Sequence, residues 1–343
     1  MLKQICYNHL RGRFGMIKTI SDIAKGLDID IVGFAGNEVL SGLQGVLESR
    51  ISKGLATEFE PKSVKDRIDP TMTLRECKGI ITIAVPYNTA CETSSRVTIK
   101  GSLSRSSWGL DYHIVVKKLL KELSGRLESV LGGSYLTFAD TGPLVDRELA
   151  YRSGLGYYGK NCCIINPIYG SYVFIGYILT SLELSSDAIP IESQCGDCRL
   201  CLDACPTGAL EAPGVLNPHK CISYLTQTKE YIPEELQKRM GVKIYGCDTC
   251  QAVCPKNKGV RSSRYKEFQP LKTGGCVDIK ELLEMSKRDY TDKYGDMAGN
   301  WRGRSVLIRN ALIAIKNMGI ESELEDQLEN LRKREVELWK PYL

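Results

Sequence analysis

The sequence has 343 residues, of which 43% are hydrophobic and 25% are charged, and its formal net charge is +5. These shares are ordinary for folded proteins and exclude a disordered or fibrous chain, and the length predicts about two domains. The longest apolar stretch, residues 172–182, is shorter than the roughly 18 residues that suggest a membrane span. Because residues 1–18 contain no apolar secretory segment, we expect a soluble, cytoplasmic protein.

The first half of the chain alternates between predicted helices and predicted strands. Apolar residues recur at helical spacing over residues 112–131, and runs rich in Ile and Val at 79–86 and 171–180 predict strands. This alternation predicts an α/β domain over residues 16–190. The other expected elements are helices near 17–25 and 145–153 and extended runs at 29–35, 134–139 and 162–168.

Two shorter regions follow this α/β domain. Residues 191–262 hold closely spaced cysteines in segments too irregular to form a layered core without an inorganic centre, which predicts a separate cluster-binding domain. Helical periodicity returns over residues 276–343 and predicts a helical tail. Its helices are expected near 279–286, 305–317 and 321–334, and Gly319 is expected to end the second of them.

The sequence contains fourteen cysteines. In a cytosolic protein they are not expected to form disulfides, because that compartment keeps thiols reduced, so clustered cysteines point to metal binding or catalysis. Residues 195–206 read C-x2-C-x2-C-x3-C-P, the run with which bacterial ferredoxins bind [4Fe–4S] clusters, and its fourth cysteine ligates a second cluster. Residues 247–255 repeat the last three cysteines of this run, and Cys221 is the only nearby candidate for the missing one. We therefore assign Cys195, Cys198, Cys201 and Cys254 to one cluster and Cys205, Cys221, Cys247 and Cys250 to the other.

The alternative to clusters is a structural zinc site, because paired C-x-x-C units also bind zinc. A zinc site has no use for the interleaved third thiolate or for the Cys-Pro step, so the spacing favours two clusters that relay electrons. The remaining cysteines have no ligand spacing and are expected to be structural. They are Cys6, Cys77, Cys91, Cys162, Cys163 and Cys276.

Two further motifs precede the cysteines. Residues 154–161, GLGYYGKN, match G-x-G-x-x-G and nearly match a phosphate loop, but a β-rich run follows them instead of a helix. We therefore expect a close approach of backbone to another ligand there. Asp140 follows an apolar strand, at a sheet edge where ligands commonly bind. It either caps the helix that starts near Leu144, or lies in an apolar pocket that raises its pKa and makes it a general acid.

Several motifs in fixed order now identify a family. They are Asp111-Tyr112-His113, residues 140–148, residues 154–161, the ferredoxin run, residues 221–226 and residues 245–248. In this combination the chain resembles epoxyqueuosine reductase over about residues 16–335. The resemblance implies an α/β cobalamin-binding domain related to reductive dehalogenases, a ferredoxin-like domain with two [4Fe–4S] clusters, and a short C-terminal HEAT-like helical tail. It also implies an activity, the reduction of epoxyqueuosine to queuosine at the wobble position of tRNA.

The resemblance further implies roles for individual residues. Electrons would pass from the clusters to a cobalamin bound base-off, and Asp140 would protonate the departing epoxide oxygen. His113 is not expected to ligate cobalt, because the D-x-H-x-x-G signature lacks its glycine here. The chain departs from many relatives at residues 104–106, where serine replaces tyrosine, and its tail is shorter than in longer members. The implied corrin contacts are Ile164, Gln227, Thr228 and Asp248.

Basic residues are concentrated between Lys256 and Arg309, where 13 Lys and Arg stand against 7 Asp and Glu. A basic surface there would suit tRNA phosphates, although an ordinary solvated helix face is the alternative. Unpaired anticodon bases would be expected to stack on aromatic rings. The candidate tRNA-binding residues are Lys256, Lys258, Arg302, Arg304 and Arg309.

Two other functions remain open at this point. A reductive dehalogenase uses the same cofactors on small organohalides, but it normally carries an export signal that residues 1–18 do not show. A two-cluster electron carrier would not need the roughly 190 residues of α/β sequence that precede the cysteines. For a tRNA-modifying reductase, we expect an external electron donor such as flavodoxin or ferredoxin.

Overall fold

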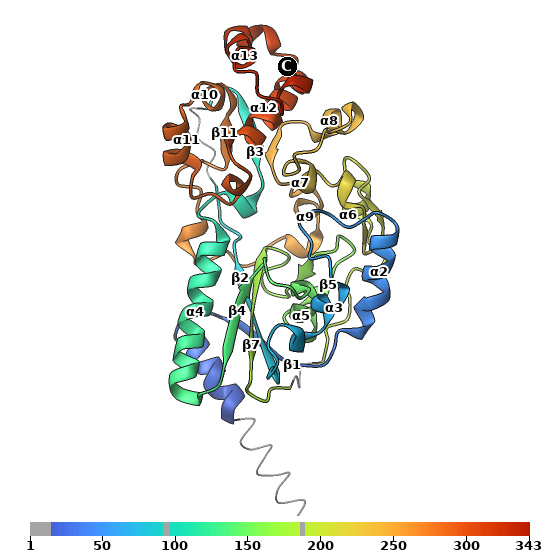
Figure 1. Ribbon diagram of the computed structural model, residues 1–343, viewed down its shortest axis with the longest axis vertical. Helices are drawn as coiled ribbons and strands as arrows, with labels where there is room; N and C mark the ends of the chain where they lie inside the picture. The colour runs from blue at the N-terminus through green and yellow to red at the C-terminus, as the bar shows by residue number, and fades with distance from the viewer. Residues whose placement is uncertain (1–14, 92–96, 186–188) are drawn as a thin grey trace, which may run out of the picture. The chain divides into compact units, whose positions relative to one another are not determined.

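The computed structural model describes residues 15–91, 97–185 and 189–343, so Cys6 lies outside the described residues. The chain divides into two compact units (Figure 1). The second unit takes in residues 87–112 as well as the cysteine-rich region and the tail. The three predicted domains, 16–190, 191–262 and 276–343, stay a prediction. The first unit comprises Met1–Pro86, His113–Gly159 and Cys163–Gly196, and the second comprises Tyr87–Tyr112, Lys160–Cys162 and Asp197–Leu343.

The first unit is built on a four-stranded sheet whose strands lie side by side in the order β1-β2-β7-β4 (Figure 1). Every neighbouring pair in this sheet is antiparallel. The expected alternation of helices and strands is present, but the rule that places ligands at the carboxyl ends of parallel strands does not apply here. The strands are β1 (Ile31–Gly36), β2 (Gly79–Pro86), β7 (Val173–Thr180) and β4 (Tyr135–Ala139).

Helices cover both faces of this sheet, which explains why β2 is apolar at nearly every position. On one face, Val116 and Leu120 of α4 (Tyr112–Leu131) lie against Gly176 in β7. On the other face, Thr82 and Tyr177 point toward α5 (Asp146–Arg152), and the Thr82 hydroxyl lies 3.0 Å from that of Ser153. The C-terminal end of α5 is therefore fixed against the sheet.

Smaller elements complete the first unit. Residues 15–25 are helical, near the predicted 17–25. Within the predicted extended run at 162–168, Ile164–Ile165 form a short antiparallel ladder with Tyr157–Tyr158, and Asn166 forms a single bridge to Gly170. The remaining elements are α2 (Gln44–Ser52), α3 (Val64–Ile68), β5 (Tyr157–Tyr158) and β6 (Ile164–Ile165).

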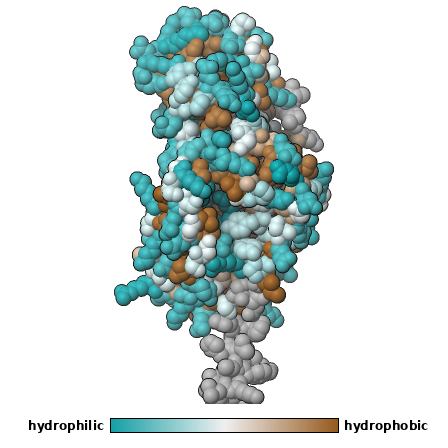
Figure 2. Space-filling view, turned by 90° about the vertical axis from the view of Figure 1, so that its right-hand side faces the viewer, coloured by the Kyte–Doolittle hydropathy of each residue, from teal (hydrophilic) through white to brown (hydrophobic). Residues whose placement is uncertain are grey.

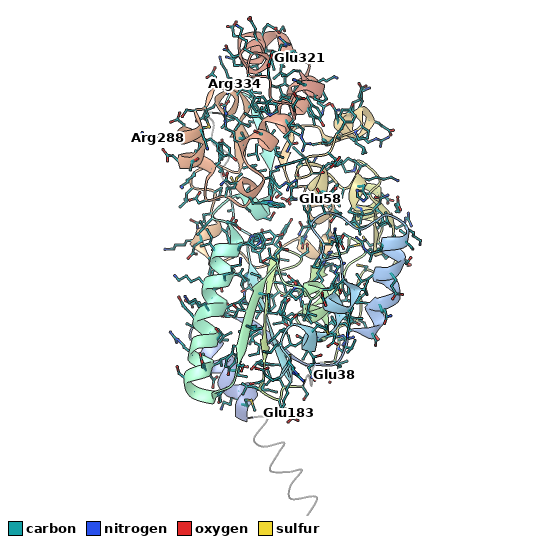
Figure 3. The ribbon with its side chains drawn as sticks, viewed as in Figure 1. Glu38, Glu58, Glu183, Arg288, Glu321 and Arg334 are labelled. Carbon is teal, nitrogen blue, oxygen red and sulfur yellow. The ribbon has the colours of Figure 1, made fainter. Side chains whose placement is uncertain are left out.

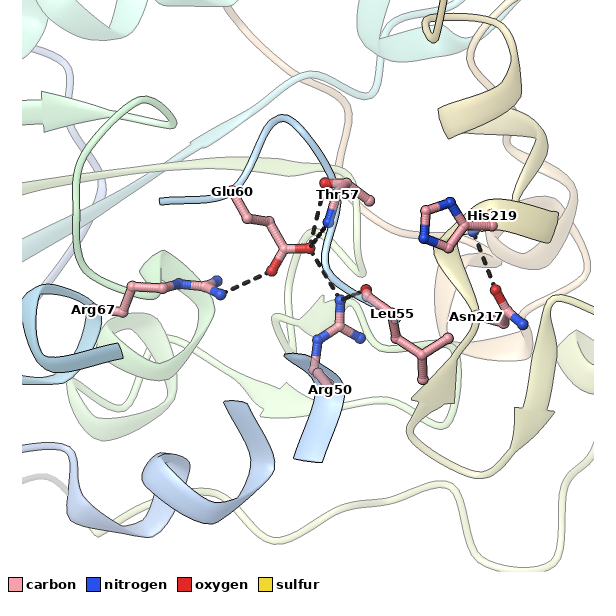
Figure 4. Close-up of polar contacts among 7 residues, drawn as sticks. All are labelled: Arg50, Leu55, Thr57, Glu60, Arg67, Asn217 and His219. Atoms are coloured by element: carbon pink, nitrogen blue, oxygen red, sulfur yellow. Dashed lines mark hydrogen bonds and ion pairs between the residues drawn. The ribbon is translucent and has the colours of Figure 1, made fainter. Parts of the chain in front are cut away.

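A charged network ties the loop between α2 and α3 to both helices (Figure 4). The Glu60 carboxylate accepts hydrogen bonds from Arg50 at 3.1 Å, from Arg67 at 2.8 Å and from the Thr57 N–H at 3.2 Å. Burial of Glu60 opposes its charge, but the two guanidinium groups and these hydrogen bonds outweigh burial and lower its pKa. The loop is thus held by a partly buried, charge-assisted cluster.

The second unit is centred on a small sheet and the helix α12 (Arg304–Met318). Residues 306–315 of α12 are all buried, and the helix ends at Gly319, whose left-handed backbone (φ 67°) forms the predicted stop. The apolar side of α12 packs with Ile244, Val277 and the following helices into one core. The sheet consists of β10 (Lys243–Tyr245), β3 (Lys100–Leu103) and β11 (Cys276–Asp278).

The expected tail helices are present with somewhat different bounds. A helix that sequence periodicity missed follows the first of them, and a capping box of Ser286 and Asp289 marks its start. Whether the tail is HEAT-like stays a prediction. The remaining elements of the second unit are α6 (Leu200–Asp203), β8 (Leu210–Ala212), β9 (Val215–Leu216), α7 (Ile222–Leu225), α8 (Glu234–Met240), α9 (Thr249–Ala252), α10 (Ile279–Glu284), α11 (Lys287–Tyr294) and α13 (Glu325–Arg332).

The face drawn in Figure 2 is mostly hydrophilic, and hydrophobic residues are scattered between the polar ones. None of the helices in the described ranges is both long enough and apolar enough to cross a membrane.

Candidate functional site

The two cysteine runs, residues 195–206 and 247–255, each form one short helix, α6 and α9, and the two helices are in contact. Cys201 lies in α6 and is 9% exposed, and Cys254 follows α9 with the same exposure. Helices of only four residues have few hydrogen bonds of their own, so they depend on what surrounds them. This is the behaviour expected of a segment that folds around an inorganic centre.

Cys221 lies within electrostatic reach of two of the other cysteines assigned to the second cluster, Cys205 and Cys247. Burial raises the pKa of the Cys221 thiol, the N–H groups of Ser223 and Tyr224 lower it, and charges on Cys247 and Cys205 raise it again. Such mutual repulsion between thiolates is relieved when a cationic metal centre binds them. The arrangement fits a shared cluster, and the full ligand assignment remains a prediction.

Hydrogen bonds around Cys205 favour the thiolate form of its side chain. Burial opposes that charge, but donors from residues 207–210, among them the Leu210 N–H and the Thr207 hydroxyl, outweigh burial and lower the pKa of Cys205. Thiolates are the form that ligates iron. The donor set is therefore chemically suited to a cluster.

The segment that carries Cys221 is fixed at both of its ends. Before it, the Asn217 side chain accepts a hydrogen bond from the His219 N–H at 3.2 Å and caps the short 3-10 helix Pro218–Lys220 (Figure 4). After it, Arg309 of α12 donates to the carbonyls of Leu225 at 2.9 Å and Thr228 at 3.1 Å. Asn310 adds a bond to the Thr226 carbonyl at 2.8 Å.

The prediction that Arg309 contacts tRNA phosphates is wrong. Its side chain is 0% exposed, because its guanidinium group is turned inward to bind these carbonyls. Sequence alone reads a basic residue on a helix as a surface residue, and nothing in the sequence signals that the loop carbonyls need a donor. Arg309 instead supports the segment that follows Cys221.

Within the described ranges, no group of three or more His, Cys, Asp or Glu side chains is close enough together to bind one metal ion. A single ion collects all its ligands on itself, whereas each thiolate of a [4Fe–4S] cluster binds its own iron.

Asp140 lies just beyond β4 in a left-handed backbone conformation, with φ of 60°. Its Oδ2 is 3.3 Å from Nε2 of His113, near the start of α4. A non-glycine residue adopts this conformation at a cost of roughly 1–2 kcal/mol, so the surrounding structure must hold it. The strand end and α4 together present a carboxyl with an imidazole beside it.

Two expectations about Asp140 are corrected by the structure. Its side chain is 60% exposed, so this unit does not enclose it in an apolar pocket. It does not cap the following helix either, because the residue at the N-terminal cap of α5 is Val145 and no side chain caps it. The capping alternative is therefore excluded, and the carboxyl remains accessible.

Sequence reasoning missed a second carboxyl beneath Asp140. Although part of Asp146 reaches the surface, burial of its carboxyl raises its pKa well above the usual value. The charge of Asp140 raises it further, whereas Arg147 and the N–H groups of Asp146 and Asp140 lower it. No sequence signal distinguishes this residue from an exposed aspartate in the first turn of a helix.

The glycine-rich segment 154–161 serves packing. A Cβ at Gly156 would lie 2.5 Å from the carbonyl oxygen of Ile165, so only glycine allows β5 and β6 to approach. Further along, the Lys160 ammonium donates to the Cys198 carbonyl at 3.0 Å. The lysine of the near phosphate-loop match thus supports the first cysteine motif.

The four implied corrin contacts differ in exposure and in hydrogen bonding. Ile164 is 4% exposed and packs with Ala84, so its side chain has little free surface. Thr228 is 2% exposed, and Gln227 accepts hydrogen bonds from the Tyr245 hydroxyl and from the Trp301 indole, both at 3.1 Å.

Asp248 is the fourth of these residues, and it has a structural partner. Burial raises its pKa, and the N–H and charge of Arg105 lower it. Its carboxylate accepts the Arg105 N–H at 2.5 Å, which fixes the segment at residues 104–106. The role of all four residues toward a corrin stays a prediction.

The other candidate tRNA contacts divide into two groups. Lys256 and Lys258 are exposed. Arg302 donates to the Gln227 carbonyl at 2.6 Å and stacks 4.7 Å from the Trp301 ring. Arg304 donates to the Met285 carbonyl at 2.6 Å. Both guanidinium groups therefore already use part of their hydrogen-bonding capacity within the protein.

The basic stretch also includes Arg288, which projects from α11 (Figure 3). It is 90% exposed and lies 3.9 Å from Asp292. The lysines and this arginine therefore leave positive charge on the surface of the second unit.

Comparison with known proteins agrees with the motifs. Residues 194–257 match the family described as "4Fe-4S double cluster binding domain", and residues 67–141 match "Epoxyqueuosine reductase QueG". The chain therefore carries a double [4Fe–4S] cluster-binding domain. Residues 67–141 include both His113 and Asp140.

Full-length relatives extend the match to most of the chain. Epoxyqueuosine reductase of Bacillus subtilis (strain 168) is 38% identical over 91% of this chain and 82% of its own length. A crystal structure of epoxyqueuosine reductase with an epoxyqueuosine-modified tRNA-Tyr stem loop has a TM-score of 0.86 and 38% identity, covering 91% of this chain and 84% of that one.

A structure of epoxyqueuosine reductase from Bacillus subtilis, with its catalytic aspartate loop swung out of the active site, has a TM-score of 0.85 and 37% identity, covering 91% of this chain and 84% of that one. Identity of this size over nearly the full length of both proteins is decisive, and the chain belongs to the epoxyqueuosine reductase family.

Proposed function

We propose that this chain reduces epoxyqueuosine to queuosine at the wobble position of tRNA. The observation that carries the proposal is the likeness over 91% of the chain to an enzyme solved with an epoxyqueuosine-modified stem loop. The exposed carboxyl of Asp140, held beside His113, supplies a proton donor of the kind that the reaction needs.

The reaction sets clear requirements. Conversion of an epoxide to an alkene breaks both carbon–oxygen bonds, consumes two electrons and two protons, and releases the oxygen as water. The electrons would enter through the two clusters from an external donor such as flavodoxin or ferredoxin. Bound cobalamin, implied by the family resemblance, would supply the strongly reducing centre that acts on the epoxide carbon.

The residues of the chain would handle the protons and the cofactor environment. Asp140 would hold a proton on its carboxyl and give it to the departing oxygen, and His113 would exchange protons with Asp140. The Nε2 of His113 is engaged with Asp140, which agrees with the expectation that this histidine would not ligate the cobalt of a base-off cofactor. Gln227 and Asp248 would contact the corrin, and Ile164 and Thr228 are the further candidates for such contacts.

The tRNA would be held by positive charge and stacking. Lys256 and Lys258 would contact phosphates, and Arg302 would add to them from beside Trp301. The Trp301 ring is 53% exposed, and its N–H is fixed by Gln227, so it offers a rigid face on which an unpaired base could stack.

The decisive experiment is a product analysis. Protein reconstituted with iron and sulfide without oxygen is given cobalamin, a chemical reductant and tRNA from cells that accumulate epoxyqueuosine, and the digested nucleosides are measured by mass spectrometry. We expect queuosine to appear as epoxyqueuosine disappears. Unchanged epoxyqueuosine with fully loaded protein and a working control enzyme would refute the proposal.

A further inference from the structure

The loop between β4 and α5 is held by contacts from residues that have no role in the proposed reaction. The loop runs from Asp140 to Val145, and its first residue holds a left-handed backbone conformation. Such a conformation persists only where neighbouring groups fix it. The contacts that could fix it lie beneath the loop, on the face of the sheet that α5 covers.

Tyr177 supports the far end of this loop. It comes from β7, is 0% exposed, and stacks on Phe138 with ring centroids 5.0 Å apart. Its hydroxyl oxygen accepts the N–H of Leu144 at 3.3 Å. A Cβ at Gly142 would lie 2.1 Å from that hydroxyl oxygen, so the loop backbone rests directly on the phenol and only glycine fits there.

Asp146 supports the near end. Its carboxylate accepts the N–H of Asp140 as well as its own N–H. Asp140 and Arg147 are the charged groups that act on it. Burial raises the pKa of Tyr177, and the charge of Asp146 raises it further. Burial of a carboxyl is costly unless hydrogen bonds compensate it, and these two N–H groups supply such bonds.

We propose that Asp146 and Tyr177 are positioning residues that clamp the two ends of the 140–145 loop and so hold the Asp140 carboxyl in its exposed, reactive placement. The proposal rests on the proposed function, in which Asp140 donates a proton. Two hydrogen bonds to backbone N–H groups, one at each end, restrict the loop far more than either bond alone. A catalytic group displaced by about 1 Å loses on the order of a hundredfold in rate.

The test compares loop motion and chemistry in matched variants. Asp146→Ala removes the acceptor for the Asp140 N–H, Asp146→Asn keeps a side-chain oxygen that can accept it, and Tyr177→Phe removes the acceptor for Leu144. Tyr294→Phe is the control, because its buried hydroxyl has no hydrogen-bond partner among the described residues. Each variant is made as the full chain with its clusters reconstituted.

Amide hydrogen exchange of the 140–145 peptide is the first readout. We expect exchange to quicken at least about tenfold in Asp146→Ala and Tyr177→Phe, and to stay near wild type in Asp146→Asn and Tyr294→Phe. Unchanged exchange in both Asp146→Ala and Tyr177→Phe would overturn the proposal. Should Asp146→Ala fail to fold, as judged by its cluster absorbance, Tyr177→Phe alone decides in the same way.

Single-turnover formation of queuosine is the second readout. We expect the rate constant to fall at least about tenfold in Asp146→Ala, with tRNA affinity within about twofold, and Asp146→Asn to recover most of it. An Asp146→Asn rate as low as that of Asp146→Ala would assign the effect to charge and overturn the clamp. If wild-type protein makes no queuosine while exchange responds as expected, the proposed function fails and the clamp stands.

Discussion

The Nε2 of His113 lies 3.3 Å from the Oδ2 of Asp140, joining the start of α4 to the end of β4. The two residues are 27 positions apart, and each is partly exposed, His113 to 25% and Asp140 to 60%. A carboxyl and an imidazole at this distance can share and exchange a proton. The pair therefore joins the acid of the proposed reaction to a group that could return its proton.

Replacement of the imidazole should slow the proton step. In His113→Gln, Asp140 loses the group beside it that can return its proton. We expect turnover to fall at least about tenfold, while iron content and cobalamin binding stay as in wild type. Turnover equal to that of wild type would separate His113 from the proton chemistry.

Asp140→Asn should retain both clusters, bind cobalamin as before and lose turnover by about 10²–10⁴-fold, the usual contribution of a general acid. Asparagine tolerates the left-handed backbone, so the change removes the proton and leaves the loop intact.

The matched control for this variant is Asp28→Asn, because Asp28 is also an exposed aspartate with positive φ, 63°. Turnover by single-turnover mass spectrometry is compared with iron content in both variants. Equal rates in Asp140→Asn and Asp28→Asn would remove Asp140 from the mechanism.

Loss of one assigned cysteine should remove one cluster. Cys221→Ser is expected to reduce iron and sulfide from about eight of each per chain toward about four, because its cluster keeps only three thiolates. Cys276→Ala is the control, since this buried cysteine lies in β11 outside the motif. Iron and sulfide analysis after oxygen-free reconstitution measures both. Full iron in Cys221→Ser would require a different fourth ligand.

The Glu60 cluster gives a prediction about stability. The pKa of Glu60 is lowered in the folded protein, so its contribution is present above the unfolded pKa and is lost as pH falls through the folded one. Glu60→Gln should lower the free energy of unfolding at pH 7 by roughly 1–3 kcal/mol, because Arg50 and Arg67 lose a charged acceptor.

The difference between Glu60→Gln and wild type should shrink toward zero in strong acid. Denaturant unfolding of both proteins at pH 7 and below pH 4 tests this, and an exposed carboxylate, Glu58→Gln, serves as control. A gap that persists unchanged into acid would show that the Glu60 charge contributes nothing.

Patterns within short stretches of sequence correctly predicted individual helices and strands and the cluster-binding domain. The amphipathic helix at 112–131 and the strand at 79–86 appear with the same bounds, because periodic apolar residues must meet a core. The cysteine run identified the cluster-binding domain for a similar reason, since ligand spacing is fixed by the cluster. Gly319 ended its helix as expected.

Relations between distant residues could not be predicted. Arg309 looks like a surface cation in sequence, yet tertiary packing turns it toward the carbonyls of the segment after Cys221. The antiparallel order of the four-stranded sheet depends on long-range pairing that alternation does not specify. The support of Asp140 by Asp146 depends on a fold that brings a helix start beneath a strand end.

Lysines of the second unit should contribute to tRNA binding through charge alone. Lys256 and Lys258 are exposed, whereas the guanidinium group of Arg309 is buried against carbonyls, so we expect opposite results from their removal. Lys256→Gln with Lys258→Gln should weaken stem-loop binding and lower the slope of log affinity against log salt by about 0.7 per lost phosphate contact. Lys121→Gln, an exposed lysine of α4 in the first unit, is the control.

Arg309→Met should leave the salt slope unchanged and lower the melting temperature, because two carbonyls lose their donor. A salt slope that falls in Arg309→Met and stays constant in the lysine variant would reverse this assignment.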